Sequence, residues 1–290
     1  MIVVTTPTGQ IGHAVVQGLL AERQSVRVIA RNPAALPDGI AENVEVFAGS
    51  HGNPEVAMAA YEGADAVLHI TPPDVHAANV RSHYRGFAAA SAAAITATGV
   101  KRAVVVSTLG RGYTAEAGHL SAALEAEGII NATGVHTRSL AMPFFMDNLL
   151  NHRSSIKDHG ILPLPNEQDK VLLTVATPDI ARVAVGLLTD RTWTGQESLP
   201  VVGPDLLTPR KMAGIISDSI GRPVHFAQVS SDTYRSTLLQ YGMSEGWVQG
   251  LADMGTAQNN GIYDVQVRDP HRVTETSFAA WVETTLKPAL

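Results

Sequence analysis

The sequence predicts an α/β protein: a doubly wound parallel sheet with a smaller mixed α/β domain. Short β-branched runs alternate with helical patterns through the first two-thirds of the 290 residues. These runs are almost continuously hydrophobic, which is typical of parallel strands covered by helices on both faces. After about Pro143, frequent prolines separate shorter elements. We therefore expect residues 1–145 to form the larger domain and 146–290 the smaller one, with a segment of about 171–203 returning to the larger.

Turn and helix signals follow the predicted strands in order. After the first strand, apolar residues recur at helical spacing from Ile11 to Leu19. A helix over residues 78–98 should end at Gly99, and one over residues 120–133 at Gly134, because glycine commonly follows the last helical turn. The six predicted strands of the sheet cover residues 1–5, 25–30, 44–49, 64–71, 102–108 and 135–142.

The C-terminal part is also patterned as strands and helices. A short strand and then a helix are expected near Pro178, followed by a second short strand, LPVVGP, at residues 199–204. Thr208, followed by Pro209, is a plausible N-cap for an amphipathic helix that ends at Gly221. Residues 230–261 have a helical pattern. We expect this part to lie over the ligand edge of the sheet.

Composition narrows the class of protein. The chain has 21 Lys and Arg against 27 Asp and Glu, a net charge of −6 without a basic run, which argues against nucleic-acid binding. It has no cysteine, so thiolate catalysis and cysteine-based zinc sites are excluded. No stretch reaches the roughly 20 apolar residues of a membrane span. We expect a cytoplasmic protein with a small-molecule substrate, no nucleic acid, no membrane and no metal, and leave a homodimer open.

The stretch TTPTGQIG, residues 5–12, lies between the first strand and the first helix. Gly9 and Gly12 have the spacing of a loop that brings backbone N–H groups to a dinucleotide pyrophosphate. Thr6 occupies the first glycine position, and a β-branched residue does not easily take a positive φ. A tight turn without a ligand is the alternative.

The second strand indicates which dinucleotide binds. NAD-binding sheets usually carry an acidic residue at its end, for the ribose 2′-hydroxyl. Here the strand ends in Ala30-Arg31-Asn32, with no acid. An arginine can instead bind a 2′-phosphate, which favours NADP(H) over NAD(H). The alternative is a solvated surface arginine.

These features resemble the NmrA-like family of atypical short-chain dehydrogenases/reductases, near its NAD(P)H-binding quinone- and azo-reductase branch. The resemblance covers nearly the whole chain, through TPTGQIG, VRVIARNP, YEGADAVLHITPPD, AAAITATGVKRAVVVSTLG, LAMPFFMDNLL, TPDIARVAVGLLTD and VVGPDLLTPRKMAGIISDSIGRPV. It implies a Rossmann-type sheet with a reduced dinucleotide across the strand ends and its nicotinamide facing a cleft. Two departures are Gly49-Ser50, where the family often has Gly-Asp, and Ala141-Met142-Pro143, where it often has Arg-Pro.

Two sets of binding residues follow from these motifs and from the strand ends. For the substrate pocket we expect Pro73, Phe144, Tyr241 and Trp247, although plain core packing is the alternative for the aromatic residues. The expected cofactor-binding residues are Thr6, Thr8, Gly9, Gln10, Ile11, Gly12, Arg31, Ser50, Ile70, Thr71, Pro72, Ser107, Thr108 and Met142.

The sequence offers three candidates for the proton donor. The usual Tyr-x-x-x-Lys pair is absent, because Tyr113 is followed four residues later by Ala117. Ser107, His119 and Tyr113 are the candidate catalytic residues, with a strand-end hydroxyl and a surface histidine as the alternatives for the first two. Quinones, azo compounds, enones and imines accept hydride without a strong protein acid, so the enzyme supplies chiefly proximity and orientation.

Two functions are compatible with these observations. The first is an NADPH-dependent oxidoreductase that transfers a hydride to a small conjugated or aromatic acceptor. The second is a non-catalytic NADP(H)-binding redox sensor that acts through a protein partner, and the missing Tyr-Lys pair favours it. The C-terminal part, with Tyr241 and Trp247, supports a substrate cleft, and we favour the reductase.

Overall fold

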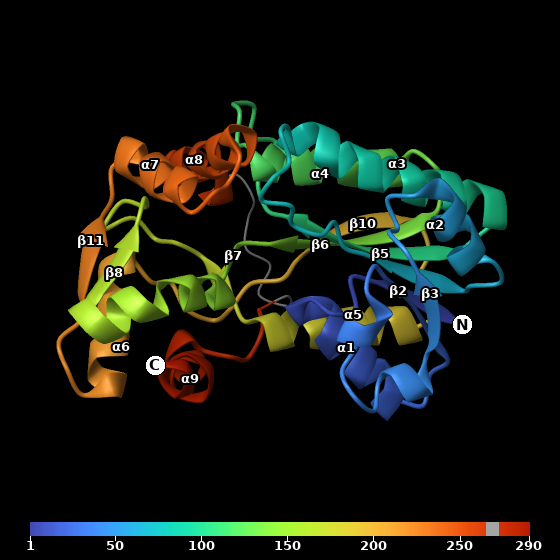
Figure 1. The fold of residues 1–290 in the computed structure, drawn as a ribbon, viewed down its shortest axis with the longest axis horizontal. Coiled ribbons are helices and arrows are strands. Elements are labelled where there is room, and N and C mark those ends of the chain that lie inside the picture. Colours follow the sequence, from blue (N-terminus) through green and yellow to red (C-terminus); the bar gives the residue numbers. More distant parts are fainter. Residues whose placement is uncertain (265–272) are drawn as a thin grey trace.

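The computed structural model describes residues 1–264 and 273–290, and seven strands of these residues form one parallel sheet (Figure 1). Their order is β10-β6-β5-β4-β1-β2-β3, so the chain starts near the centre and winds outward in both directions. The predicted doubly wound fold is therefore confirmed. The strands are β1 (Ile2–Thr5), β2 (Val26–Ala30), β3 (Glu45–Ala48), β4 (Ala66–His69), β5 (Arg102–Thr108), β6 (His136–Met142) and β10 (Gln196–Pro200).

Helices cover both faces of the sheet. On one face lie α1 (Gln10–Ala21) and α5 (Thr177–Thr189); on the other lie α2 (Pro54–Tyr61), α3 (Val80–Thr98) and α4 (His119–Asn131) (Figure 1). Each layer buries its own apolar core against the sheet, as the continuous hydrophobic strands require.

Local sequence explains where the helices begin and end. The Asn79 side chain accepts from the Ser82 backbone N–H at 2.8 Å before α3, and Gly99 ends that helix with a φ of 69°. Likewise the Thr208 side chain caps α6 (Pro209–Ile220), and Gly221, with a φ of 71°, ends it. These caps satisfy terminal backbone groups, and those predicted ends are confirmed.

The segment of residues 171–203 contributes α5 and β10 to the sheet and its helix layers. β10 pairs with β6 in parallel, from Gln196 opposite Thr137 to Pro200 opposite Ala141. The strand predicted at residues 199–204 therefore begins too late. β10 is an edge strand whose first residues are polar and exposed, so hydrophobicity alone did not reveal it.

The remaining C-terminal elements form a smaller lobe beyond the ends of β5 and β6 (Figure 1). β7 (Phe144–Phe145) pairs with β9 (Thr174–Val175), and β8 (Ile161–Leu164) with β11 (His225–Gln228). Among the described residues, no helix combines the length and apolar character of a membrane span. The other elements of this lobe are α7 (Ser231–Gln240), α8 (Glu245–Asn259), α9 (Phe278–Trp281) and the short helical turns η3 (Met146–His152), η4 (Ser155–His159), η5 (Ile262–Asp264), η7 (Val282–Leu286) and η8 (Lys287–Ala289). Two further short turns, η1 (Pro33–Ala35) and η2 (Ala41–Asn43), lie between β2 and β3.

Candidate active site

A cavity of about 920 Å³ follows the carboxyl ends of the strands, where ligands of doubly wound sheets bind. Its lining comes from the carboxyl ends of β1 to β6 and the segments after them, from α3 and α4, and from α8 and η5 of the smaller lobe. Each residue that the sequence assigns to the cofactor lines this cavity. Of the other predicted site residues, Pro73, His119, Phe144 and Trp247 line it as well.

The loop after β1 brings bare backbone to the cavity. Thr6 has a φ of 49°, so the β-branched residue does occupy the left-handed region that we expected it to avoid. Its carbonyl accepts from the Gly9 N–H at 3.0 Å, which closes the turn. A Cβ on Gly12 would lie 2.2 Å from that carbonyl oxygen, so only glycine fits there.

This loop fits a dinucleotide pyrophosphate. α1 has Gly9 as its N-cap, without a side-chain cap bond, and the first N–H groups of a helix lack intrahelical partners. Gln10, Ile11 and Gly12, which form its first turn, line the cavity. A helix N-terminus of this kind attracts anions through its dipole and its N–H groups.

Polar residues at the ends of β2 and β3 line the same side of the cavity. Arg31 directly follows β2 and is exposed. Asn32 uses its side-chain oxygen to accept from the Ala34 N–H at 3.2 Å, which starts the 3₁₀ turn η1. Ser50 accepts from the Gly52 N–H at 3.2 Å. The cationic side chain here is therefore Arg31, and Ser50 contributes no charge.

Ser107 and Thr108, at the end of β5, donate their hydroxyl protons to protein acceptors. The Ser107 hydroxyl donates to the Glu127 carboxylate at 2.6 Å, and that of Thr108 to the Met142 carbonyl at 3.2 Å. Glu127 is only 2% exposed and also accepts from Arg111 at 2.5 Å. Both hydroxyl oxygens consequently offer acceptor lone pairs, and no free proton, to a ligand in the cavity.

Our sequence reasoning missed Glu127. It lies on α4, seven residues after the buried Leu120 and three before the buried Ile130. A charged residue on the apolar face of a helix is a signal, since buried charges are rare unless paired. Helical spacing could therefore have indicated that Glu127 is paired. It could not have identified the partners, which come from β5 and the following loop.

His119, at the start of α4, is buried between helices. Its Nε2 lies 3.3 Å from the Trp247 carbonyl, and the two rings are 4.2 Å apart, edge to face. Because that carbonyl can only accept, Nε2 carries the proton when the ring is neutral. Burial lowers the pKa of His119 to about 4. The surface alternative for His119 does not hold, and near neutral pH the ring lacks the second proton of a general acid.

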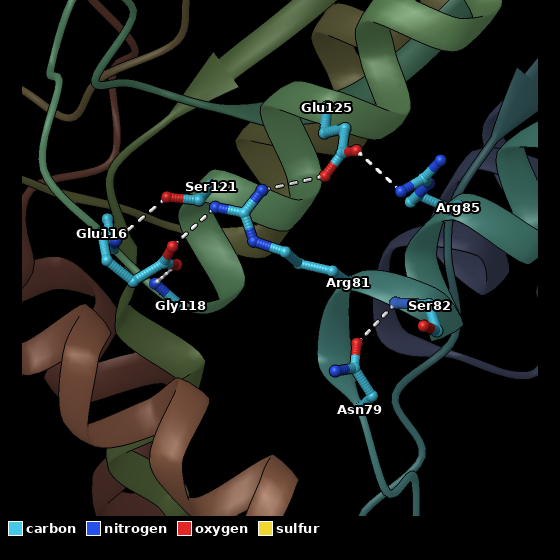
Figure 2. Close-up of polar contacts among 9 residues, drawn as sticks. Asn79, Arg81, Ser82, Arg85, Glu116, Gly118, Ser121 and Glu125 are labelled. Atoms are coloured by element: carbon cyan, nitrogen blue, oxygen red, sulfur yellow. Dashed lines mark hydrogen bonds and ion pairs between the residues drawn. The ribbon is translucent and has the colours of Figure 1, made fainter.

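A polar network holds the start of α4 in place (Figure 2). Arg81 of α3 donates to Glu116 at 2.6 Å and to Glu125 at 3.1 Å. Glu116 also accepts from the Gly118 N–H at 2.8 Å. A Cβ on Gly118 would lie 2.0 Å from the Gly250 carbonyl oxygen, so α4 touches α8 backbone to backbone. Exposed ion pairs contribute little energy individually, but this network and the glycine contact together fix His119 beside α8.

Two predicted site residues do not line the cavity in the part of the chain that the structure describes. Tyr113 packs against the core of the smaller lobe. Tyr241 follows α7 and is 76% exposed. The helical pattern of residues 230–261 placed Tyr241 and Trp247 together, but it comprises two helices, and of these two residues Trp247, on the second helix, lines the cavity.

The half of the cavity near the smaller lobe is mainly apolar. Phe144 and Phe145 line it from β7, and Trp247, Leu251 and Met254 from α8. Flat ligands are commonly held between such walls, with a few polar groups that fix their orientation. The polar groups on this side, which sequence reasoning did not single out, are Tyr84, Asn148, Gln258 and Tyr263.

Two buried histidines lie beside the adenine end expected from Arg31. His51 lines the cavity, and its ring packs edge-on to that of His69 at 5.7 Å. The Ser91 hydroxyl bridges His69 Nδ1 at 2.9 Å and the Tyr61 hydroxyl at 3.0 Å. Burial lowers the pKa of His51 to about 3 and that of His69 to about 4, so both rings are neutral near pH 7.

Nearly the whole length of the chain supports a family assignment. The family model described as the NmrA-like family matches residues 1–281. The chain belongs to the NmrA-like family. The resemblance predicted from the glycine loop and the C-terminal motifs is therefore confirmed.

Two curated relatives and one solved structure are similar over most of the chain. NAD(P)H azoreductase of Xenophilus azovorans is 29% identical over 254 residues, covering 88% of this chain and 86% of that enzyme. (4-Alkanoyl-5-oxo-2,5-dihydrofuran-3-yl)methyl phosphate reductase of Streptomyces griseus is 31% identical over 240 residues, covering 82% and 80%. NADPH-dependent quinone oxidoreductase of Escherichia coli, solved with NADPH, has a TM-score of 0.83 at 21% identity, covering 97% and 98%, and supports the fold.

Proposed function

We propose that this protein is an NADPH-dependent reductase that transfers a hydride to a small conjugated or aromatic acceptor. The observation that carries the proposal is the continuous cavity, which runs from the glycine loop and Arg31 to the apolar wall around Phe144 and Trp247. The predicted reductase activity agrees with the activities named for both curated relatives. When bound, NADPH would supply the hydride.

Each end of the cavity has its own role in this proposal. The N-terminus of α1 would hold the pyrophosphate, and Arg31 the 2′-phosphate of NADP(H). Ser107 would accept from an amide N–H of the cofactor, because its own proton is donated to Glu127. The walls at Phe144 and Trp247 would stack a flat acceptor and exclude water, so binding itself brings the reacting atoms together.

The direct test is turnover by the purified protein. NADPH is mixed with a quinone, an azo dye, an enone and an imine in turn, and the loss of reduced-nicotinamide absorbance is followed. Phe144→Ala should impair turnover of every acceptor that the wild type reduces, whereas Tyr241→Phe, on the surface, should not. Tight NADPH binding without turnover of any acceptor would refute the reductase and support the redox sensor.

A further inference from the structure

Tyr263 and Gln258 form a polar pair in the otherwise apolar half of the cavity. Both residues line it, and both are only 6% exposed. Ile262, beside Tyr263 in η5, packs onto Gly110, since a Cβ on that glycine would lie 2.6 Å from the Ile262 side chain. Gly110 follows β5 by two residues, so the tyrosine belongs to a turn that covers the end of the strand carrying Ser107 and Thr108.

A chain of hydrogen bonds fixes the direction of the Tyr263 hydroxyl. Asn166 donates from Nδ2 to Gln258 Oε1 at 2.9 Å, and Gln258 donates from Nε2 to the Tyr263 hydroxyl oxygen at 2.9 Å. Because the amide oxygen of Gln258 accepts from Asn166, its NH₂ group turns to the phenol. The phenol oxygen is then an acceptor toward Gln258, and its own O–H remains for another partner. No described residue accepts that proton.

The two hydroxyls on β5 itself cannot fill this role. Ser107 and Thr108 give their protons to Glu127 and to the Met142 carbonyl. A carbonyl acceptor placed between the strand ends and α8 would therefore find acceptors on the strand side and a donor at Tyr263.

The geometry points to Tyr263 as the hydrogen-bond donor to the substrate oxygen, with Gln258 as the residue that positions it. This inference rests on the proposed reductase function and names the acceptors that Tyr263 assists, which are carbonyl-bearing ones such as enones and quinones. For an enone, the hydride that NADPH would give up from a C–H bond of its nicotinamide, leaving NADP⁺, forms a C–H bond at the β-carbon. The C=C electron pair moves to form a new C=C bond, and the carbonyl electron pair moves onto oxygen.

Tyr263 stabilises the resulting oxyanion by its O–H, and water supplies the proton that completes the reduction. Burial raises the pKa of Tyr263 above its ordinary value, so the phenol stays protonated and able to donate across the working pH range. Such a preformed donor stabilises the charge that develops in the transition state more than it stabilises the neutral substrate.

The first test is Tyr263→Phe, with Tyr61→Phe as the matched control. Tyr61 also has a buried, hydrogen-bonded hydroxyl but does not line the cavity. Tyr263→Phe should lower kcat/KM for an enone or quinone by about 10²-fold, while reduction of a cationic triarylmethyl dye, which gains no oxyanion, stays unchanged. Tyr61→Phe should spare both reactions. Equal losses on the enone and the dye, or no loss on the enone, would overturn the role of Tyr263.

A binding measurement tests the same donor without turnover. The probe is p-nitrophenolate, titrated into the protein with NADP⁺ and followed by its absorbance. A hydrogen bond to a charged oxygen contributes about 1.5–3 kcal/mol, so Tyr263→Phe should raise the Kd at least about tenfold. An unchanged Kd would refute the donor even if no acceptor is turned over. Wild-type turnover without any effect of Tyr263→Phe on rate or Kd would leave the reductase standing and remove this inference alone.

Gln258→Glu tests the positioning role. A carboxylate at this position accepts the phenol proton and withdraws it from the cavity. Gln258→Glu should therefore resemble Tyr263→Phe on the enone and in p-nitrophenolate binding, and should add nothing further in the double variant, since both remove one interaction. Additive losses in the double variant would show that Gln258 acts through general packing.

Discussion

Thr6→Gly tests whether the loop after β1 holds its threonine in a strained conformation. Thr6 and Arg23 are the two non-glycine residues with positive φ among those that the structure describes, at 49° and 56°. For an L-residue, the left-handed region costs roughly 1–2 kcal/mol. Glycine removes that cost but loses about 0.5–1 kcal/mol through the greater freedom of the unfolded chain. The expected net stabilisation is about 0.5–1 kcal/mol, the difference between the middle values of these ranges.

The assay is thermal unfolding without ligand. With an unfolding entropy near 2.1 cal/mol/K per residue, a chain of this length should gain about 1–2 °C in Tm. Arg23→Gly, at the same kind of φ but outside the cavity, should gain similarly. Thr8→Gly, in the same loop at an ordinary φ, should lose about 0.5–1 kcal/mol. If Thr6→Gly destabilises the protein as much as Thr8→Gly does, the threonine is not strained and our reasoning fails.

Three further predictions concern charge. Arg31→Ala should raise the Kd of NADPH about tenfold or more and leave that of NADH nearly unchanged, because only NADPH carries the 2′-phosphate; equal effects in a fluorescence titration would remove Arg31 from the site. Glu127→Gln should lower the free energy of unfolding in urea by about 1–2 kcal/mol through weaker bonds to Ser107 and half-exposed Arg111; unchanged stability would contradict the buried pair. The pKa of His69 is lowered to about 4, so its contribution to stability is fully present above pH 6.5 and is lost, by roughly 3 kcal/mol, as the pH falls toward 4. His69→Phe should flatten the curve of unfolding free energy against pH over that window. An unaltered slope would refute the lowered pKa of His69.

Sequence reasoning selected residues that line the cavity where a signal lies within one strand and the turn that follows it. The glycine loop, Arg31 and Thr71 each follow a buried strand, and parallel strands bring their carboxyl ends to one edge. The alanine-rich run before Gly99 likewise predicted a helix over residues 78–98, and α3 ends at Thr98 with Gly99 as its C-cap. Such signals are local, so one sequence contains them in full.

The missed residues depend on contacts between distant segments. Tyr263 reaches the cavity because η5 packs on Gly110, more than 150 positions earlier in the chain. The orientation of the Tyr263 hydroxyl depends on Asn166, which lies 97 positions before Tyr263 in the chain. Neither residue has a local pattern that separates it from ordinary loop polar residues. The exposed Tyr241 shows the converse, since an aromatic residue in a helical pattern says nothing about which helix face meets the sheet.

Ser107→Ala separates the two ends of the proposed reaction. Because the Ser107 proton is donated to Glu127, this hydroxyl can only accept from a ligand. If the donor to the substrate is Tyr263, Ser107→Ala should raise the Kd of NADPH, through the lost acceptor for the cofactor amide, by about tenfold at most. The kcat for an enone at saturating NADPH should change far less than in Tyr263→Phe. A larger fall in kcat for Ser107→Ala than for Tyr263→Phe would instead make Ser107 the proton donor. In that case Glu127 would deliver a proton to Ser107 and would not act only as the acceptor of the Ser107 proton.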